Sequence, residues 1–435
     1  MTQSLETESY EAYARKNYLW NLVFNVGDGA FYWLTFGLAS TMTVLPLYIS
    51  HFTSSALLIG LPSTLANLGW FLPQLFTASY VEKLPRKLPF VLLVSLNERL
   101  PFLFMGLTIL FWPSMAPGLA LVFFFLFFCW YSFGAGFTAT GWQELIAKIM
   151  PERKRGLFFG LQGFFGGILG MLGALASQHF LENHPFPYDF AYLFLLGFVA
   201  LMVSWCSLAL TREMPSATSK PPIPYRAYLR RLPLILHQNR NYTFFLIAQA
   251  IACSGTMAYG FIAIYAVKSF HLPDHTIGWF TAVYQFSQIL SNPLLGRLGD
   301  EKGHKLVLEM AAFNGVLATG VAFLAHSPGC FYLAMAFSGF AIAGRVISGM
   351  SIVYEFCSPD DRPTYIGLTN TLLGPFIGLS PIFGGWVADT LGYQTLFGLA
   401  FLLDILACGL WHWLVKDPRH ASGSLYLEER GCPIP

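Results

Sequence analysis

Long apolar stretches alternate with short polar loops along almost the entire chain. A helix needs roughly 20 residues to cross the hydrocarbon core of a bilayer, because each residue adds about 1.5 Å along its axis. Twelve stretches are long enough, and they predict an all-α polytopic membrane protein with twelve transmembrane helices. They cover residues 18–50, 55–81, 88–112, 117–142, 155–180, 190–211, 241–268, 276–296, 304–326, 330–356, 363–389 and 394–416.

One polar segment, residues 213–240, interrupts this rhythm. It is rich in proline and carries four arginines, at positions 226, 230, 231 and 240. We therefore expect a linker between two pseudo-symmetric six-helix bundles. The predicted division is an N-terminal cytoplasmic tail (1–16), a first bundle (17–212), the cytoplasmic linker (213–240), a second bundle (241–416) and a C-terminal cytoplasmic tail (417–435).

The positions of Lys and Arg orient these helices, since both residues collect in cytoplasmic loops. With both termini in the cytoplasm, 22 of the 25 Lys and Arg residues fall on that side, whereas Arg99 and Arg345 lie within helices and Lys268 lies outside. The first sixteen residues are polar and lack the apolar core of a secretory signal, so the first span is predicted to be retained. We expect a multi-pass protein of the plasma (inner) membrane.

Composition narrows the class of protein. Hydrophobic residues make up 55% of the chain and charged residues 11%, which is too little charge for a soluble globule of 435 residues. The net charge of +2 lies in short loops, so no nucleic-acid partner is expected. The seven cysteines have no metal-type or redox-type spacing, and no enzyme motif is present. The chain is therefore predicted to be no enzyme and to hold no metal.

The two halves repeat each other in sequence. A shift of 218 residues places Leu58-Ile59-Gly60 on Thr276-Ile277-Gly278, and it places residues 78–87 on residues 296–305 without a gap. Duplicated halves with a binding site at their interface are a common plan among transporters.

Residues 296–305 read Gly-Arg-Leu-Gly-Asp-Glu-Lys-Gly-His-Lys. This decapeptide resembles the signature loop of the major facilitator superfamily, Gly-x-Leu-x-Asp-x-x-Gly-x-Lys/Arg, and with the twelve spans and the linker the resemblance covers about residues 17–416. The first-half copy departs from it at Ala78, Glu82 and Pro85, and the family patterns of the fourth and fifth spans are missing. The resemblance implies a transporter fold and leaves the subfamily open.

The first predicted span carries a stripe of polar residues. Asn21, Asn25, Asp28 and Tyr32 are spaced by four, three and four residues, which places them on one face of a helix. Asp28 lies roughly a third to halfway across the predicted span. An ionised carboxylate at such a depth costs about 2.5 to 3.5 kcal/mol on insertion scales, and it usually faces a cavity or a partner. Burial favours the neutral form of a carboxyl group, so Asp28 is the candidate proton carrier. A permanently hydrogen-bonded Asp28 that only fixes helix packing is the alternative.

Two residues of the second half could face the same cavity, because the resemblance implies that spans 1, 4, 7 and 10 line it. Arg345 in the tenth span needs a partner, since an unpaired buried guanidinium is very costly. It could bind an anionic group of the substrate, pair with an acid across the cavity, or form a structural salt bridge within its own half. Gln249 in the seventh span is a candidate cavity ligand.

Other polar residues within the spans predict structural networks. Glu98 and Arg99 are consecutive in the third span, so their side chains leave the helix about 100° apart and are not expected to face one partner. We interpret them, and Asp404 in the twelfth span, as structural. Amide-rich stripes on the second and eighth spans, at Asn67 and Gln285 for example, are expected to bond across the interface between the halves.

The signature loop predicts a conformational gate. If Asp300 lies at the cytoplasmic N-terminus of the fifth span beside Arg155, it accepts hydrogen bonds from uncapped amides and favours one closed arrangement. Its repeat mate Glu82 would face the eleventh span near Arg362. The gate residues, with the signature glycines, are Asp300, Arg155, Glu82, Arg362, Gly296 and Gly303.

These features together predict a secondary active transporter that moves a small organic solute by alternating access. We expect coupling to protons, with the proton gradient as energy source and no cofactor, and export rather than uptake. The partners are the solute and the lipid bilayer, and the protein is expected to be a monomer. An uncoupled facilitator or an importer is the alternative within transport, and a membrane scaffold or assembly factor with the same fold is the alternative outside it.

Overall fold

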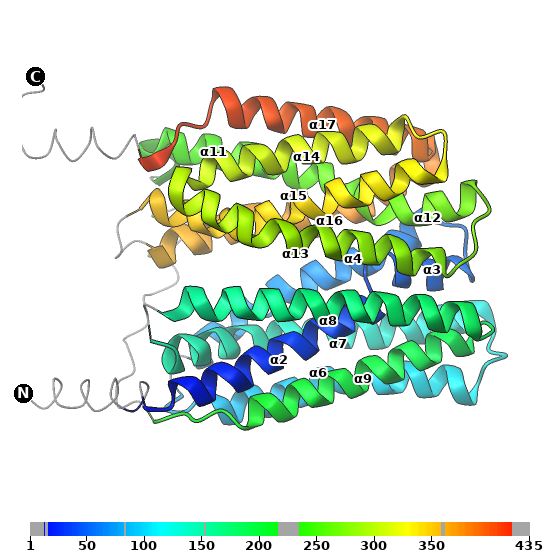
Figure 1. Ribbon diagram of the computed structural model, residues 1–435, viewed down its shortest axis with the longest axis horizontal. Helices are drawn as coiled ribbons and strands as arrows, with labels where there is room; N and C mark the ends of the chain where they lie inside the picture. Colours follow the sequence, from blue (N-terminus) through cyan, green and yellow to red (C-terminus); the bar gives the residue numbers. More distant parts are fainter. Residues whose placement is uncertain are drawn as a thin grey trace, which may run out of the picture.

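The structure is a computed structural model that describes residues 13, 16–81, 84–151, 154–215, 235–357 and 362–419. Nearly all of these residues are helical, as the apolar pattern predicts (Figure 1). The principal helices are α2 (Tyr18–Leu38), α3 (Val44–Ser50), α4 (Ala56–Phe71), α5 (Gln74–Val81), α6 (Leu88–Phe111), α7 (Pro117–Ile149), α8 (Arg155–Asn183), α9 (Tyr188–Ala209), α11 (Arg240–Gly255), η2 (Thr256–Ala258), α12 (Tyr259–Ser269), α13 (Thr276–Lys302), α14 (His304–Phe323), α15 (Pro328–Glu355), α16 (Arg362–Leu391) and α17 (Tyr393–Trp413).

Nine helical segments among the described residues are long and apolar enough to cross a membrane. The chain is thus an integral, multi-pass membrane protein, and the all-α prediction is confirmed. The remaining predicted spans correspond to α2 with α3, α4 with α5, and α13. The count of twelve fits this architecture and stays a prediction. The nine segments are Leu88–Phe111, Pro117–Ile149, Phe158–Asn183, Tyr188–Ala209, Arg240–Ser269, His304–Phe323, Pro328–Glu355, Leu368–Leu391 and Tyr393–Trp413.

Three of the predicted spans are interrupted rather than continuous. The first breaks between α2 and α3, the second breaks at Leu72–Pro73, and the seventh passes through the short 3₁₀ segment η2. With the repeat shift of 218 residues, Leu38 at the end of α2 falls on Thr256, the first residue of η2. The first and seventh spans therefore break at equivalent positions, which agrees with an internal repeat.

The helices form two groups that follow the chain (Figure 1). Helices α2 and α6 to α9 lie on one side, and α11 and α13 to α17 lie on the other. Helix α2 begins and α17 ends at the same end of the bundle, which we call the near end; the opposite end, with residues 51–55 and 270–275, is the far end. Most of the predicted linker lies outside the described residues.

Close helix contact fixes α2 within the first group. A Cβ atom on Gly37 of α2 would collide with the backbone carbonyl oxygen of Gly170 in α8, and one on Gly173 would meet the carbonyl oxygen of Leu34 at 2.5 Å. Small residues at such crossings let two helix backbones approach closely. The glycine-rich fifth predicted span thus holds the helix that carries Asp28.

Candidate functional site

A cavity of about 390 Å³ opens beside Asp28, with a wall formed by α2, α4, α6, α7, α8 and α9. Every residue that lines it belongs to the first half of the chain, so the cavity wall described here comes from one bundle. Three of the lining residues are charged and five are aromatic. The lining residues are Asp28, Gly29, Tyr32, Trp33, Phe36, Trp70, Ser95, Glu98, Arg99, Ala135, Thr138, Ala139, Trp142, Gln162 and Leu208.

The carboxylate of Asp28 points into a polar setting rather than toward lipid. Its side chain is buried, with 5% of the residue exposed. Ser204 Oγ of α9 donates to Asp28 Oδ1 at 2.6 Å, and Trp142 Nε1 of α7 donates to Oδ2 at 3.3 Å. The carboxylate therefore has two donors on neighbouring helices and a cavity beside it.

Glu98 of α6 is the second carboxylate in the cavity wall, and it is also buried. Tyr32 OH donates to Glu98 Oε1 at 2.9 Å, and the hydroxyl groups of Tyr32 and Tyr131 lie 3.3 Å apart. Tyr32, predicted from the polar stripe of the first span, thus links α2 to this carboxylate. A chain of hydroxyl and carboxyl groups runs along the cavity wall.

Arg99 lies between the two carboxylates but makes its hydrogen bonds to neutral oxygen atoms. Its Nε donates to the carbonyl of Leu201 at 2.9 Å, Nη1 to the carbonyl of Ser95 at 2.7 Å, and Nη2 to Ser204 Oγ at 3.2 Å. The nearest carboxylate oxygens are farther away, at 3.9 Å for Asp28 and 3.7 Å for Glu98. Arg99 therefore acts on both acids through its charge without a direct hydrogen bond to either.

Glu98 and Arg99, which the sequence predicts to form a structural network, both line the cavity. Their first contacts do diverge, Glu98 toward Tyr32 and Arg99 toward α9, as helix geometry requires. The long arginine side chain nevertheless brings its guanidinium back to the carboxylate of the preceding residue. Consecutive charged residues can thus share one cavity.

Asn21 and Asn25 lie two turns and one turn before Asp28, and neither lines the cavity. Asn21 exchanges two hydrogen bonds with the backbone of Arg212, at 2.9 and 3.0 Å, and Asn25 Nδ2 donates to Thr211 Oγ1 at 3.0 Å. These contacts tie α2 to the segment that follows α9. The predicted stripe is real, but only its inner part, Asp28 and Tyr32, lines the cavity.

The second half holds a separate buried ion pair. Arg345 Nη2 of α15 lies 3.8 Å from Asp404 Oδ1 of α17, and Thr319 Oγ1 of α14 donates to Asp404 Oδ2 at 3.1 Å. Of the three readings of Arg345, the salt bridge within its own half matches this geometry. Neither Arg345 nor Gln249, which is also buried, belongs to the residues that line the cavity.

The two halves are joined at the far end. Asp389 of α16 accepts hydrogen bonds from Ser55 Oγ at 2.7 Å, from the backbone N–H of Leu57 at 2.9 Å and from that of Ala56. Thus a carboxylate of the second half caps the first turn of α4 in the first half. His51 Nε2 lies 3.0 Å from Asp274 Oδ2 across the same boundary.

Deeper contacts continue this closure toward the middle of the bundle. The hydroxyl groups of Thr43 and Thr281 lie 2.6 Å apart, and Asn67 Nδ2 donates to the carbonyl of Ile377 at 3.5 Å. Asn67 of the second predicted span therefore reaches the other half, as predicted, whereas Gln74 of the same stripe donates to the carbonyl of Trp70 in its own span. The conformation described here is closed at the far end.

The predicted gate lies at the near end. Asp300 is exposed in the last turn of α13, and its backbone carbonyl accepts a hydrogen bond from Arg419 Nη1 at 2.9 Å. Glu82 lies outside the described residues, and only the backbone of Arg155 and Arg362 is described. The predicted contacts between Asp300 and Arg155 and between Glu82 and Arg362 therefore stay predictions.

The signature glycines differ in what they do. Gly303 has φ 95°, a conformation that residues with a side chain rarely adopt, and it forms the turn between α13 and α14. A Cβ atom there would also lie 2.6 Å from Asp417 Oδ2. Among the described residues, no atom beyond the backbone of its own helix and its chain neighbours lies within 4 Å of the position that a Cβ on Gly296 would take.

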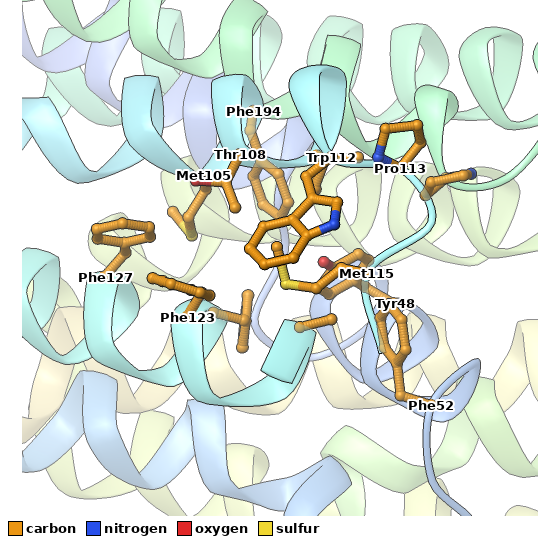
Figure 2. Close-up of a pocket in the computed structure, with 14 residues that line it drawn as sticks. Tyr48, Phe52, Met105, Thr108, Trp112, Pro113, Met115, Phe123, Phe127 and Phe194 are labelled. Atoms are coloured by element: carbon orange, nitrogen blue, oxygen red, sulfur yellow. The ribbon is translucent and has the colours of Figure 1, made fainter. Parts of the chain in front are cut away.

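A second hollow, shown in Figure 2, lies nearer the far end between α3, α6, α7 and α9. Its volume is about 30 Å³, which is enough for a water molecule but not for an organic solute. Figure 2 shows aromatic and methionine side chains such as Trp112, Phe123 and Met115 around it. Since no charged residue lines this hollow, the cavity beside Asp28 is the better candidate site.

Comparison with known proteins agrees with this architecture. The model of the Major Facilitator Superfamily matches residues 244–431. The resemblance to the major facilitator superfamily is confirmed. Matching curated relatives include the MFS-type transporter TOXA of Cochliobolus carbonum, which is 24% identical over 35% of this chain and 28% of its own chain. The efflux pump apf11 of Gibberella fujikuroi is 25% identical over 34% of this chain and 26% of its own chain. The match thus spans about a quarter of the length of these relatives.

Solved transporters share the fold over most of the chain. A mutant of the nucleoside transporter NupG superposes with a TM-score of 0.72 at 15% identity, and the match covers 91% of this chain and all of that one. The D-xylose-proton symporter gives a TM-score of 0.68 at 14% identity, over 94% and 99% of the two chains. At these identities the likeness establishes the fold.

Sequence reasoning passed over two residues that hold Asp28. Ser204 and Trp142 bond its two carboxylate oxygens from the sixth and fourth predicted spans. A serine within an apolar helix gives a weak signal, since such hydroxyl groups commonly bond their own backbone. The contact joins residues 176 positions apart, and no local pattern announces it.

Proposed function

We propose that this protein is a secondary active transporter of a small organic solute, coupled to protons through Asp28, and that it works by alternating access in the plasma (inner) membrane. The observation that carries the proposal is the position of a buried carboxylate on the wall of a 390 Å³ cavity at mid-depth in the helices. Ionisable groups at such positions commonly mark proton and substrate pathways.

The closed far end supports alternating access. Contacts such as the cap that Asp389 places on α4 are made across the boundary between the halves, so they can break when the halves rock apart. The cap itself is a small number of hydrogen bonds, and the helices beneath it also pack closely, since a Cβ atom on Gly385 of α16 would lie 2.6 Å from the carbonyl oxygen of Ala56 in α4. A cavity beside Asp28 together with a breakable seal at one end fits a transporter cycle.

Export is proposed over uptake. In the major facilitator superfamily, a pattern of the fifth span that ends Gly-Pro-x-x-Gly-Gly is associated with antiporters. The fifth span lacks it here, but Gly374-Pro375-x-x-Gly378 in the eleventh predicted span resembles part of it and favours export. Matching relatives that are named efflux pumps, such as apf11, favour it as well.

The proposal is tested with the purified protein in proteoliposomes that carry a pH-sensitive dye inside. A solute identified by thermal stabilisation of the protein is added, and we expect proton movement that Asp28→Asn abolishes while binding of the solute persists. Glu182→Gln, an exposed carboxylate on α8, serves as the control and should behave like the unaltered protein. If Asp28→Asn retains concentrative transport with unchanged proton movement, Asp28 is structural and another group carries the proton. If the unaltered protein moves its solute without any proton movement, an uncoupled facilitator replaces the proposal.

A membrane scaffold with the same fold is the second candidate, from a different functional class. The cavity of 390 Å³ argues against it, because a scaffold needs no space of that size between its helices. A protein whose cavity is reachable from neither side of the membrane would favour the scaffold.

A further inference from the structure

We propose that the cavity beside Asp28 binds an organic cation with an apolar or aromatic body, and that the cation and a proton compete for the same pair of carboxylates. This inference rests on the proposed transport function and names the class of its substrate. The low charge of the helices predicted to line the cavity favours a neutral, amphipathic or zwitterionic solute, and the inference departs from that expectation.

The first step is a charge count on the cavity wall. Asp28 and Glu98 are the acids that line the cavity, and Arg99 is the lining cation. All three residues are buried to 5% exposure or less. Two ionised carboxylates and one guanidinium leave one negative charge over, and an uncompensated charge inside a membrane protein is costly. One further positive charge in the cavity would neutralise this excess.

The second step is that Arg99 directs its hydrogen bonds away from the two carboxylates. Three of its nitrogen atoms already donate to the carbonyls of Ser95 and Leu201 and to Ser204 Oγ. Its closest approach to a carboxylate oxygen is 3.7 Å, so neither acid is paired with it by a direct hydrogen bond.

The third step concerns the shape and chemistry of the wall. Five aromatic residues line the cavity, and three of them are tryptophans. Aromatic faces attract cations that lie within about 6 Å of the ring centre, and tryptophan does so best. Carboxylates that take the positive charge and aromatic rings that pack around its substituents suit an ammonium group on an apolar body. The lining aromatic residues are Tyr32, Trp33, Phe36, Trp70 and Trp142.

The fourth step links this cation to protons. A proton on either carboxylate removes the excess negative charge just as a bound cation does, so the two ligands exclude one another. The titratable groups that face Asp28 from the neighbouring helices are Arg99 and Glu98 of α6, with Tyr32 and Tyr131 completing the hydrogen-bonded chain. Exchange of one cation for one proton follows from this geometry without a further site.

The test measures binding by the full-length protein in nanodiscs through tryptophan fluorescence and calorimetry. The probes are benzyltrimethylammonium, benzylsulfonate and benzyl alcohol, which share one ring and differ in charge. We expect the cation to bind at least about tenfold more tightly than the anion or the alcohol. Its affinity should fall as the pH is lowered, by up to about tenfold per pH unit if one proton is exchanged.

Substitutions distinguish the contribution of the carboxylates to binding from that of the aromatic residues. Asp28→Asn and Glu98→Gln should each abolish the preference for the cation and flatten its pH dependence, whereas Glu182→Gln should change neither. Trp70→Leu should weaken binding of the cation by about 2- to 30-fold while the pH dependence persists. Asp28→Glu keeps the negative charge and serves as the control for loss of folding. Thermal melting of every variant shows whether it is folded.

Equal affinity for the three probes, or cation binding that does not change with pH, would overturn the proposal. Its failure can be told apart from failure of the transport function. Ala135→Cys lines the cavity, and its labelling by a membrane-impermeant thiol reagent reports access from either side. Access from both sides without a preference for the cation leaves transport standing and removes only the proposed substrate class.

Discussion

Removal of the Asp389 side chain should open the far end of the protein. This carboxylate accepts hydrogen bonds from Ser55 Oγ and from the first two backbone N–H groups of α4, across the boundary between the halves. Helix caps contribute about 0.5 to 2 kcal/mol, and a carboxylate at a helix N-terminus adds a few tenths to 1 kcal/mol through the helix dipole. The site is exposed, so we take about 1 to 2 kcal/mol for the loss in Asp389→Ala.

A loss of that size changes the ratio of closed to open molecules by about 5- to 30-fold. Helix α4 itself should survive, because Ser55 Oγ also accepts a hydrogen bond from the N–H of Leu58, at 3.5 Å. The effect therefore falls on the closure between the halves. Asp389→Asn, which keeps one oxygen acceptor, should give a smaller shift in the same direction.

The assay is the distance between spin labels at Ser114 and Gln394, exposed positions at the far end of the two halves, measured by double electron resonance. The native cysteines are replaced beforehand. We expect a longer-distance population that grows in Asp389→Ala and stays unchanged in Glu182→Gln. An identical distance distribution in Asp389→Ala and the unaltered protein would refute the reasoning.

Three further predictions concern stability and are checked by thermal melting of the purified protein. Arg99→Leu leaves two buried acids without their cation and should cost about 3 to 5 kcal/mol, of which Glu98→Gln in the same chain restores a part. Asp404→Leu should lower the stability by a similar amount. The double variant with Arg345→Met should recover most of that loss, because an apolar pair can often replace a buried ion pair. Losses of stability that simply add in the double variant would contradict this. Gly303→Ala should cost at least about 1 to 2 kcal/mol because its φ of 95° is unfavourable for other residues, and an unchanged melting temperature would contradict that reading.

The fold could be predicted from the sequence because the membrane imposes a local rule on it. Each span must be long and apolar, so helices such as Leu88–Phe111 and Tyr188–Ala209 can be recognised from the hydropathy of their own residues alone. The breaks at η2 and between α2 and α3 were not predicted. The chain is apolar on both sides of each break, and Ser40, Thr41 and Thr43 at the first are too weakly polar to divide a predicted span.

The candidate site could be predicted only in part. Asp28 stands out because a carboxylate in an apolar helix is rare, and Tyr32 follows from helical spacing. The partners of Asp28 lie on α6, α7 and α9, and which residues of those helices face it depends on how each helix is rotated and packed. The pairing of Arg345 with Asp404 has the same origin, since α15 and α17 meet only in the folded protein.

Access to the cavity from both sides of the membrane is the claim on which the proposed transport cycle depends. Ala135→Cys, in a chain whose native cysteines are replaced, is reacted with a membrane-impermeant thiol reagent added to one side of oriented vesicles at a time. We expect labelling from each side, with Asp389→Ala raising the rate from the far end and lowering it from the near end. Labelling confined to one side in both proteins, or to neither, would contradict alternating access.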